Sequence, residues 1–311
     1  MNVLKETNFS NLGEKITGKV RDIYIQEDKL ILITTDRHSS FDRNIAHIPF
    51  KGEILTQISN FWFEKTKDII PNHILSTPDP QAVVVNKYTV VPVEVVIRGY
   101  MTGSTNTSLW THYKEGHRDF GNFILPDGMK KNQKLAQPVF TPSTKSDEHD
   151  VTMTPAKMIE KGIVDSELLK NIEEIGIKLF ERGQRIALDK GLILVDTKYE
   201  FGVDKDGKLF LVDEIHTPDS SRYWQAKSYQ EKFDTDLEPE YFDKEFLRLW
   251  FKENSDPYND KTIPNAPEEM VTELSKRYSN IYQQLLGKEF ITDRKEPILD
   301  RLRKNLEKYT V

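Results

Sequence analysis

The sequence predicts an α+β protein in which most strands pair antiparallel. Strand-like runs of apolar residues fill the first third of the chain, and helical spacing dominates from Asp243 onward. Between these regions, strands and helices do not alternate in the regular way that a doubly wound parallel sheet requires. We therefore expect antiparallel sheets accompanied by separate groups of helices.

The first third of the chain contains a predicted hairpin and one helix. The hairpin joins residues 15–25 to residues 29–35 through a polar turn. Gly18 interrupts its first arm, where glycine marks a bulge or a close approach of another backbone. Residues 54–65 carry apolar side chains at helical spacing, which predicts a helix among these strands.

The middle of the chain changes from strands to loops. Residues 82–85 and 90–97 are β-rich runs, and each is predicted to form a strand. Residues 116–146 contain many Gly, Pro, Asn and Lys residues. Long connections of this composition are often functional, so we expect loops that contact a ligand or cover it.

Two helices are predicted after these loops. Thr154 is a typical N-cap and a proline follows it at the first helical position, so a short helix begins here and ends near Gly162. Asp165 caps a longer helix with an apolar side, which ends at Gly191.

The composition excludes several classes of function. The 311 residues include 44 Lys+Arg, 50 Asp+Glu and no cysteine, for a formal charge of −6. Without cysteine there is no disulfide, thiolate zinc site, iron–sulfur cluster or cysteine nucleophile. The acidic balance gives no general attraction to nucleic acid or anionic lipid, and we find no apolar signal sequence or membrane-spanning stretch. We expect a cytoplasmic globular protein without nucleic-acid or membrane partners.

A second hairpin is predicted around the four-residue turn 204–207. Its strands cover residues 192–203 and 208–215. If these four residues form the turn, Val203 pairs with Lys208 and Lys198 lies opposite Asp213. Directly paired residues share a face of the sheet, so both side chains are expected on one face.

This hairpin concentrates charged residues. Asp196, Lys198 and Glu200 alternate along one strand, so they point to the same face, where Asp213 is expected to join them. Three carboxylates and one ammonium are costly to bury unless a cation is present, and oxygen-only ligands suit Mg²⁺. The alternative is a solvated face with ordinary surface ion pairs. Strongly apolar neighbours in both strands favour a central hairpin whose charges lie in a cleft.

Three other segments are candidates for binding anions. Residues 16–24 combine Gly18 with Lys19 and Arg21, which alternate along the chain and would share one face of a strand. Taken alone, these residues favour a hairpin with basic, solvent-facing side chains over a phosphate site. The strand that ends at Arg98 continues into a loop of small and hydroxyl residues, and Arg222 follows two serines. The P-loop and dinucleotide-binding glycine motifs are absent from the sequence.

Two further chemistries are disfavoured. Residues 35–44 contain Asp, His and Ser, but residues so close along one loop rarely form a catalytic triad, and no G-x-S-x-G motif is present. The seven histidines are scattered without a zinc-binding signature, and the pair His149 and Asp150 is not one either. We expect neither a triad hydrolase nor a zinc site.

Five segments resemble motifs of the SAICAR synthetase (phosphoribosylaminoimidazole-succinocarboxamide synthase) family, in the family's order. The two long ones are VVPVEVVIRGYMTGS at 90–104 and LVDTKYEFG at 194–202. The three shorter ones are GKVRDIY at 18–24, TPSTK at 141–145 and DEIHTPDSSRYW at 213–224. The chain length resembles the longer, single-function form of the family. Residues beyond Tyr229 match none of its motifs.

The resemblance implies an ATP-dependent ligase of purine biosynthesis. The family joins the carboxylate of carboxyaminoimidazole ribonucleotide (CAIR) to the amine of L-aspartate, and forms SAICAR, ADP and phosphate. The implied fold has a kinase-like, antiparallel nucleotide-binding domain at residues 1–87. A larger α+β domain at residues 88–311 carries the substrate and Mg²⁺ sites and the C-terminal helices, with ATP in the cleft between the domains.

The resemblance also implies a role for individual residues. The catalytic residues are Lys198, which contacts the transferred phosphoryl group, and Asp196, which contacts the imidazole substrate. The ATP-binding residues are Gly18, Lys19 and Arg21 at the phosphates, Asn86 and Lys87 at the hinge beside adenine, and Lys198. The substrate-binding residues are Arg98, Ser104 and Arg222 at the ribonucleotide phosphate, with Ser40 and Asp42 in a more variable loop. The Mg²⁺ ligands are Glu200 and Asp213, and the loop 145–150 is assigned to L-aspartate.

The implied chemistry agrees with the residues. A carboxylate does not react with an amine until it is activated, most simply as an acyl phosphate made from ATP. That step needs cations around a phosphoryl group rather than a nucleophilic side chain. Two alternatives stay open: a small-molecule kinase that uses the same nucleotide cleft, and a nucleotide-sensing module without turnover.

Overall fold

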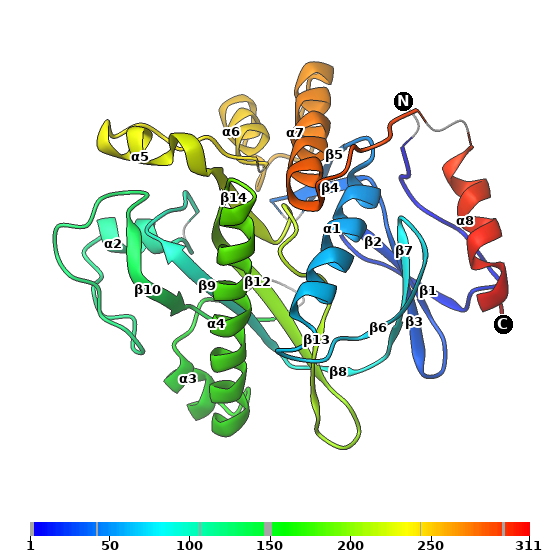
Figure 1. Ribbon diagram of the computed structural model, residues 1–311, viewed down its shortest axis with the longest axis horizontal. Coiled ribbons are helices and arrows are strands. Elements are labelled where there is room, and N and C mark those ends of the chain that lie inside the picture. The colour runs from blue at the N-terminus through cyan, green and yellow to red at the C-terminus, as the bar shows by residue number, and fades with distance from the viewer. Residues whose placement is uncertain (1–2, 42, 106, 146–150, 243, 294–295) are drawn as a thin grey trace. The chain divides into compact units, whose positions relative to one another are not determined.

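The structure is a computed structural model that describes residues 3–41, 43–105, 107–145, 151–242, 244–293 and 296–311 (Figure 1). The strands are β1 (Glu14–Thr17), β2 (Arg21–Ile25), β3 (Lys29–Thr34), β4 (Arg37–Ser40), β5 (Arg43–His47), β6 (Ile74–Asp79), β7 (Ala82–Asn86), β8 (Thr89–Val90), β9 (Val93–Tyr100), β10 (Lys134–Phe140), β11 (Ser143–Thr144), β12 (Leu192–Val203), β13 (Leu209–Val212) and β14 (Ser221–Gln225). The helices are α1 (Lys51–Thr66), α2 (Leu109–Lys114), α3 (Pro155–Glu160), α4 (Ser166–Asp189), α5 (Ala226–Asp234), α6 (Glu245–Asn254), α7 (Glu268–Leu286) and α8 (Ile298–Leu306), followed by the 3₁₀ turn η1 (Glu307–Tyr309).

The chain forms two compact units. Unit 1 consists of Met1–Phe61, His73–Lys87 and Phe242–Val311, and unit 2 consists of Trp62–Asn72 and Tyr88–Tyr241. All pairs of named strands are antiparallel, which confirms the predicted α+β class. None of the described helices is long and apolar enough to cross a membrane.

Unit 1 is built on a five-stranded sheet of order β1-β2-β3-β7-β6, beside the two-stranded ribbon β4-β5. Its core joins residues from both ends of the chain, because Leu302 and Leu306 of α8 pack with Leu4 and Phe9 (Figure 1). The buried Arg301 holds α8 in place: its Nε donates to Asp79 Oδ2 at 3.0 Å.

The C-terminal segment corrects the predicted domain division. We expected residues 88–311 to form the larger domain, but Phe242–Val311 groups with unit 1. The physical reason is packing: Ser275 of α7 donates to the Pro49 carbonyl at 2.8 Å, and α8 fills the core described above. These are contacts between distant parts of the sequence, which local patterns do not record. The boundary after Lys87 coincides with one of the observed boundaries.

Unit 2 is built on a seven-stranded sheet with the path β10-β9-β12-β13, to which β8, β11 and β14 are added. The helix α4 packs along β9 and β12 (Figure 1). Two glycines allow this close packing. A Cβ at Gly176 would lie 3.2 Å from Val95 Cγ1, and one at Gly183 would lie 2.8 Å from Leu194 Cδ2 and 2.4 Å from His216 Cε1.

Both helices predicted after the central loops begin at the expected caps. The Thr154 side chain accepts from Lys157 N at the start of α3, and the Asp165 side chain accepts from Glu167 N at 2.8 Å at the start of α4. The helix α4 ends where Gly191 adopts a positive φ of 74°. Local sequence therefore determines both helix starts and the end of α4.

The first predicted hairpin is wrong in detail. Residues 15–25 form two strands rather than one arm, because the chain reverses at Lys19 and Val20. The Gly18 N–H donates to the Arg21 carbonyl at 2.8 Å and closes this turn. The alternating spacing suggested that Lys19 and Arg21 share one strand face. Lys19 instead lies in the turn, so the two side chains do not share a strand face.

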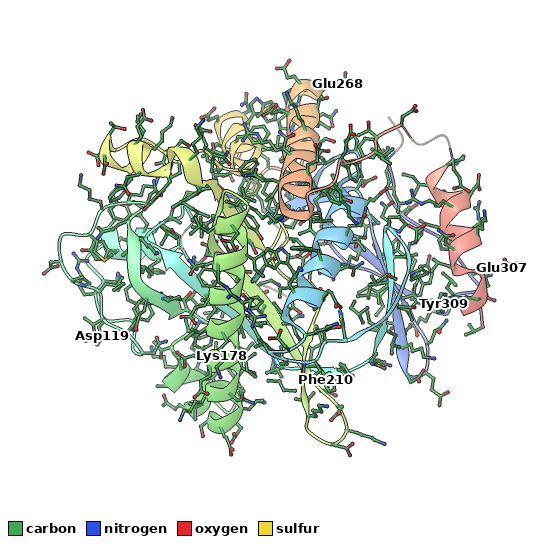
Figure 2. The ribbon with its side chains drawn as sticks, viewed as in Figure 1. Asp119, Lys178, Phe210, Glu268, Glu307 and Tyr309 are labelled. Carbon is green, nitrogen blue, oxygen red and sulfur yellow. The ribbon has the colours of Figure 1, made fainter. Side chains whose placement is uncertain are left out.

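The second hairpin is shifted by one residue from its predicted register. Val203 pairs with Leu209, not with Lys208. Lys208 belongs to the turn, where its N–H donates to Asp204 Oδ1 at 2.9 Å. Close to this turn, the ring of Phe210, which is labelled in Figure 2, stacks on the ring of Tyr88 with centroids 4.2 Å apart.

Candidate active site

A row of charged side chains lies on one face of the central strands of unit 2. Asp196, Lys198 and Glu200 alternate along β12, and Arg98 on β9 pairs directly with Asp196. The opposite face of β9 is covered by α4, since Val95 and Ile97 contact the helix at Gly176. The charged row is therefore on the face away from α4, and its residues share one face, as the spacing predicted.

Lys198 is surrounded by carboxylates. Its Nζ lies 2.7 Å from Glu200 Oε1 and 3.0 Å from Glu94 Oε1, and Lys145 contacts the other oxygen of Glu200. Burial disfavours the charged lysine, but Glu200, Asp213 and Glu94 together outweigh burial and raise the pKa of Lys198. The lysine therefore remains protonated at physiological pH.

Asp213 reaches this group by a route that the sequence did not predict. In the observed register Glu200 pairs with Val212, so continued pairing would place Asp213 opposite Tyr199, on the other face from Lys198. However, β13 ends at Val212, and Asp213 adopts a positive φ of 69°. This left-handed residue redirects the chain, and the Asp213 carboxylate is close enough to Lys198 to raise its pKa.

Asp196 lies between two arginines. Its Oδ2 is 3.5 Å from Arg98 Nη1 and 3.4 Å from Arg222 Nη1. That oxygen is buried, and within the described part of the chain it has no hydrogen-bond partner. Burial lowers the pKa of Arg98 to about 10, while the charge of Asp196 raises this pKa and the charge of Arg222 lowers it. Because the pKa is still well above physiological pH, Arg98 stays charged.

The two arginines are positioned by different contacts. Arg98 Nε donates to Thr141 Oγ1 at 2.9 Å, and Arg98 Nη2 donates to the Thr107 carbonyl at 3.3 Å. Arg222 approaches Gly103, where an added Cβ would lie 3.1 Å from Arg222 Nη1. Gly103 has a positive φ of 112° and precedes the exposed Ser104. The structure thus brings Arg98, Arg222, Asp196 and the chain next to Ser104 together.

Five of the six predicted ATP-binding residues belong to unit 1, and the sixth, Lys198, belongs to unit 2. Gly18 and Lys19 form the turn between β1 and β2, and Arg21 begins β2. The Asn86 N–H donates to the His73 carbonyl at 2.8 Å, and the Lys87 N–H donates to the Asp28 carbonyl at 3.0 Å. Both backbone donors are therefore already used within unit 1.

The loop predicted to contact substrate is described in part. Ser40 ends β4, and its buried Oγ has no hydrogen-bond partner among the described residues. Asp42 lies outside the described residues, and so does most of the loop assigned to L-aspartate, residues 146–150.

Sequence reasoning missed Glu94 as a member of the charged row. Glu94 lies four residues before Arg98 on β9 and therefore on the same face, and its Oε2 accepts from Ser143 Oγ at 3.2 Å. The even spacing Glu94, Val96, Arg98 was the available signal.

Comparison with known proteins identifies relatives along almost the whole chain. The family model described as SAICAR synthetase matches residues 14–264. A phosphoribosylaminoimidazole-succinocarboxamide synthase from Legionella pneumophila (strain Paris) is 47% identical over 307 residues, which cover 98% of this chain and 98% of the relative.

Solved structures give the same result. SAICAR synthase from Saccharomyces cerevisiae, complexed with SAICAR, is similar with a TM-score of 0.78 and 31% identity, over 92% of this chain and 99% of that chain. A structure of SAICAR synthetase in complex with ADP has a TM-score of 0.67 and 28% identity, over 89% of this chain and 100% of that chain. On these grounds the chain belongs to the SAICAR synthetase family.

Proposed function

We propose that this protein joins the carboxylate of CAIR to the amine of L-aspartate at the expense of ATP, to give SAICAR, ADP and phosphate. The observation that carries the proposal is the charged row of unit 2. In it, Lys198 is surrounded by carboxylates, and Asp196, two residues earlier on the same strand, lies between two arginines. Family membership supports the same reaction.

The arginine end of the row is proposed to bind the ribonucleotide. Guanidinium groups bind phosphate through paired N–H donors, and Arg98 and Arg222 both approach Gly103 or its neighbours. Ser104 adds a hydroxyl to this group. Asp196, whose buried Oδ2 accepts no hydrogen bond from the described residues, is proposed to accept one from the imidazole part of the substrate.

Lys198 is proposed to stabilise the phosphoryl group during transfer. A carboxylate oxygen of CAIR attacks the γ-phosphorus of ATP, ADP leaves, and an acyl phosphate forms. The amine of L-aspartate then attacks the acyl carbon, loses a proton, and displaces phosphate. In the first step negative charge spreads over the phosphoryl oxygens, and a fixed ammonium stabilises that charge. Gly18, Lys19 and Arg21 are proposed to contribute further contacts to the ATP phosphates.

The carboxylates around Lys198 suit a bound Mg²⁺. Glu94, Glu200 and Asp213 are countered by the ammonium groups of Lys198 and Lys145, so one negative charge is in excess. Among the described residues these three do not bring their ligand atoms within 4.8 Å of one another. A site in which not all three carboxylates converge still suits Mg²⁺. This ion usually takes one or two carboxylates from the protein and completes its coordination with phosphate and water.

Glu200 and Asp213 are the proposed Mg²⁺ ligands. When bound there, Mg²⁺ would neutralise charge on the nucleotide phosphates. Lys145 and Lys198 hold Glu200 on both of its oxygens, which fixes its orientation.

We also propose a cytoplasmic location, which the lack of cysteine in the sequence supports.

The reaction is tested by measuring phosphate release from ATP and Mg²⁺ in the presence of CAIR, with and without L-aspartate. We expect release only with all three substrates, together with an equal amount of SAICAR. Release with CAIR alone, independent of aspartate, would instead indicate a kinase. Retained ATP binding without any release would indicate a nucleotide-sensing module.

The Mg²⁺ ligands are tested by replacing Asp213 with Asn. We expect the Mg²⁺ concentration for half-maximal activity to rise by about 10-fold, because a neutral amide binds the ion less strongly than a carboxylate. Asp206→Asn, in the exposed turn of the same hairpin, is the control and should leave the titration unchanged. An unchanged titration for Asp213→Asn would count against this residue as a ligand.

A further inference from the structure

A group of metal-ligating side chains lies where α2 ends in unit 2. His112, Glu115 and His117 each offer a ligand atom, and these atoms all lie within 4.8 Å of one another. In the part of the chain that the structure describes, this is the single group of three or more such residues. We propose that it binds a divalent transition-metal ion, and that Zn²⁺ is the ion best suited to it.

The backbone at the end of α2 holds the two histidines together. The Gly116 N–H donates to the Tyr113 carbonyl at 3.0 Å, and the His117 N–H donates to the His112 carbonyl at 3.0 Å. This pair of hydrogen bonds is the Schellman arrangement, which requires a positive φ at its turning residue. Gly116 supplies it with a φ of 99°. The His112 and His117 rings therefore meet edge to face, with centroids 5.4 Å apart.

A second contact orients the His117 ring. Its Nδ1 lies 3.1 Å from the His112 carbonyl oxygen. Because a carbonyl oxygen only accepts hydrogen bonds, this contact places the proton of the neutral ring on Nδ1. Nε2 then carries the lone pair that binds a metal. Histidine ligands in proteins are commonly oriented in this way, by a hydrogen bond from the ring nitrogen that does not bind the metal.

The donor set distinguishes this group from the carboxylates around Lys198. Two imidazoles and one carboxylate favour Zn²⁺ and its neighbours in the transition series, whereas an oxygen-only set suits Mg²⁺. Three protein ligands leave one position of a tetrahedral ion for water or another molecule.

Space for such a molecule is present next to the histidines. Both rings line a cavity of about 710 Å³, with Asp119 and Phe120 of the following loop on the same cavity. Asp119 is labelled in Figure 2.

No pattern in the sequence indicates this site, and from the sequence we expected no zinc site. The spacing H-x-x-E-x-H is not a zinc signature, because on a continuous helix the second histidine would lie away from the first. The helix instead ends at Lys114, and the turn at Gly116 returns His117 to His112. The ligands are thus assembled by a helix ending rather than by a helix face.

The proposal is tested by titrating the untagged full-length protein with Zn²⁺ in a calorimeter, in the presence of excess Mg²⁺ to occupy oxygen-only sites. We expect one equivalent of saturable binding. His117→Ala and Glu115→Gln should each weaken it by at least about 10-fold. His47→Ala, which removes a histidine in unit 1, should leave it unchanged.

Two further measurements separate ligand loss from misfolding. The melting temperatures of the metal-free variants should match that of the unaltered protein, and Zn²⁺ should raise the melting temperature only where the three ligands are intact. Co²⁺ should give visible absorption bands of a four- or five-coordinate ion, which disappear in His117→Ala. Zinc binding that persists unchanged in His117→Ala, or no saturable binding by the unaltered protein, would overturn the proposal.

Discussion

Two buried aspartates, one in each unit, have the same charge and opposite surroundings. Asp22 in unit 1 accepts hydrogen bonds from Thr7 N at 2.6 Å, Thr7 Oγ1 at 2.9 Å and Arg37 Nη2 at 2.9 Å, and Lys15 lies 3.3 Å away. Asp196 in unit 2 also faces two cations, but its Oδ2 lies 3.4 and 3.5 Å from them and has no hydrogen bond among the described residues.

The difference in hydrogen bonding indicates that Asp22 is a structural carboxylate, whereas Asp196 is suited to binding a ligand. Leaving a buried acceptor unsatisfied costs free energy, so folding alone favours the arrangement around Asp22. The arrangement around Asp196 becomes favourable when a bound molecule supplies the missing donor. The contrast therefore predicts that substitutions near Asp22 lower stability, whereas substitutions in the charged row of unit 2 lower activity.

The largest effect is expected at Lys198. Lys198→Ala should lower kcat by about 10³-fold or more, because the Lys198 ammonium is proposed to stabilise the charge that develops on the transferred phosphoryl group. Stopped reactions that quantify SAICAR would measure this loss, while circular dichroism verifies the fold. Lys15→Ala is the matched control, since Lys15 pairs with Asp22 and should affect stability alone. Near-normal turnover in Lys198→Ala would refute the assigned role.

The next effect concerns stability. Asp22→Asn should lower the free energy of unfolding by about 3–5 kcal/mol, because Arg37 would keep a buried charge without its partner. Urea denaturation measures the change, and the KM values of molecules that remain folded should be unaltered. A variant with normal stability would contradict the structural role of this carboxylate.

A third buried aspartate adds pH dependence. Burial raises the pKa of Asp36 from 3.8 to about 6, although the N–H groups of Gly52 and Leu4 act against the shift. The native state therefore favours the protonated form. The stabilising contribution is complete below about pH 3.8 and is lost as the pH rises through 6. At pH 7 the cost is about 3 kcal/mol at most.

Asp36→Asn removes this titration. The unfolding free energy of the unaltered protein, relative to that of the variant, should therefore fall between pH 4 and pH 7. Denaturation curves at several pH values test the slope. A constant difference between the two proteins would show that Asp36 does not titrate in this range.

The smallest effect is expected at Asp196 itself. Asp196→Asn should raise the KM for CAIR by about 10- to 30-fold, in line with the loss of one charge-assisted hydrogen bond. Its unfolding free energy should change less than that of Asp22→Asn. Initial-rate kinetics and denaturation of both variants decide the matter: a large stability loss with an unchanged KM would remove the distinction between the two aspartates.

Local patterns in the sequence predicted those parts of the site that depend on a single element. The alternation of Asp196, Lys198 and Glu200 determines their shared face, and the caps Thr154 and Asp165 determine where helices begin. Glu94 could have been found by the same alternation.

Other features depend on contacts that local patterns do not contain. The hairpin register changed by one residue because Lys208 joined the turn, and Asp213 still reached Lys198 through an unusual backbone angle. The placement of Phe242–Val311 depends on buried contacts with residues more than 200 positions earlier, such as the one between Ser275 and Pro49.

That placement has a consequence for how the chain is made. A ribosome finishes all of unit 2 at Tyr241, long before unit 1 is complete. Leu4 and Phe9 emerge long before Leu302 and Leu306, with which they pack. The nascent sheet of unit 1 therefore keeps apolar surface exposed for most of translation and offers it to chaperones. A chain truncated before Ile298 would keep that surface exposed and become a substrate for proteases.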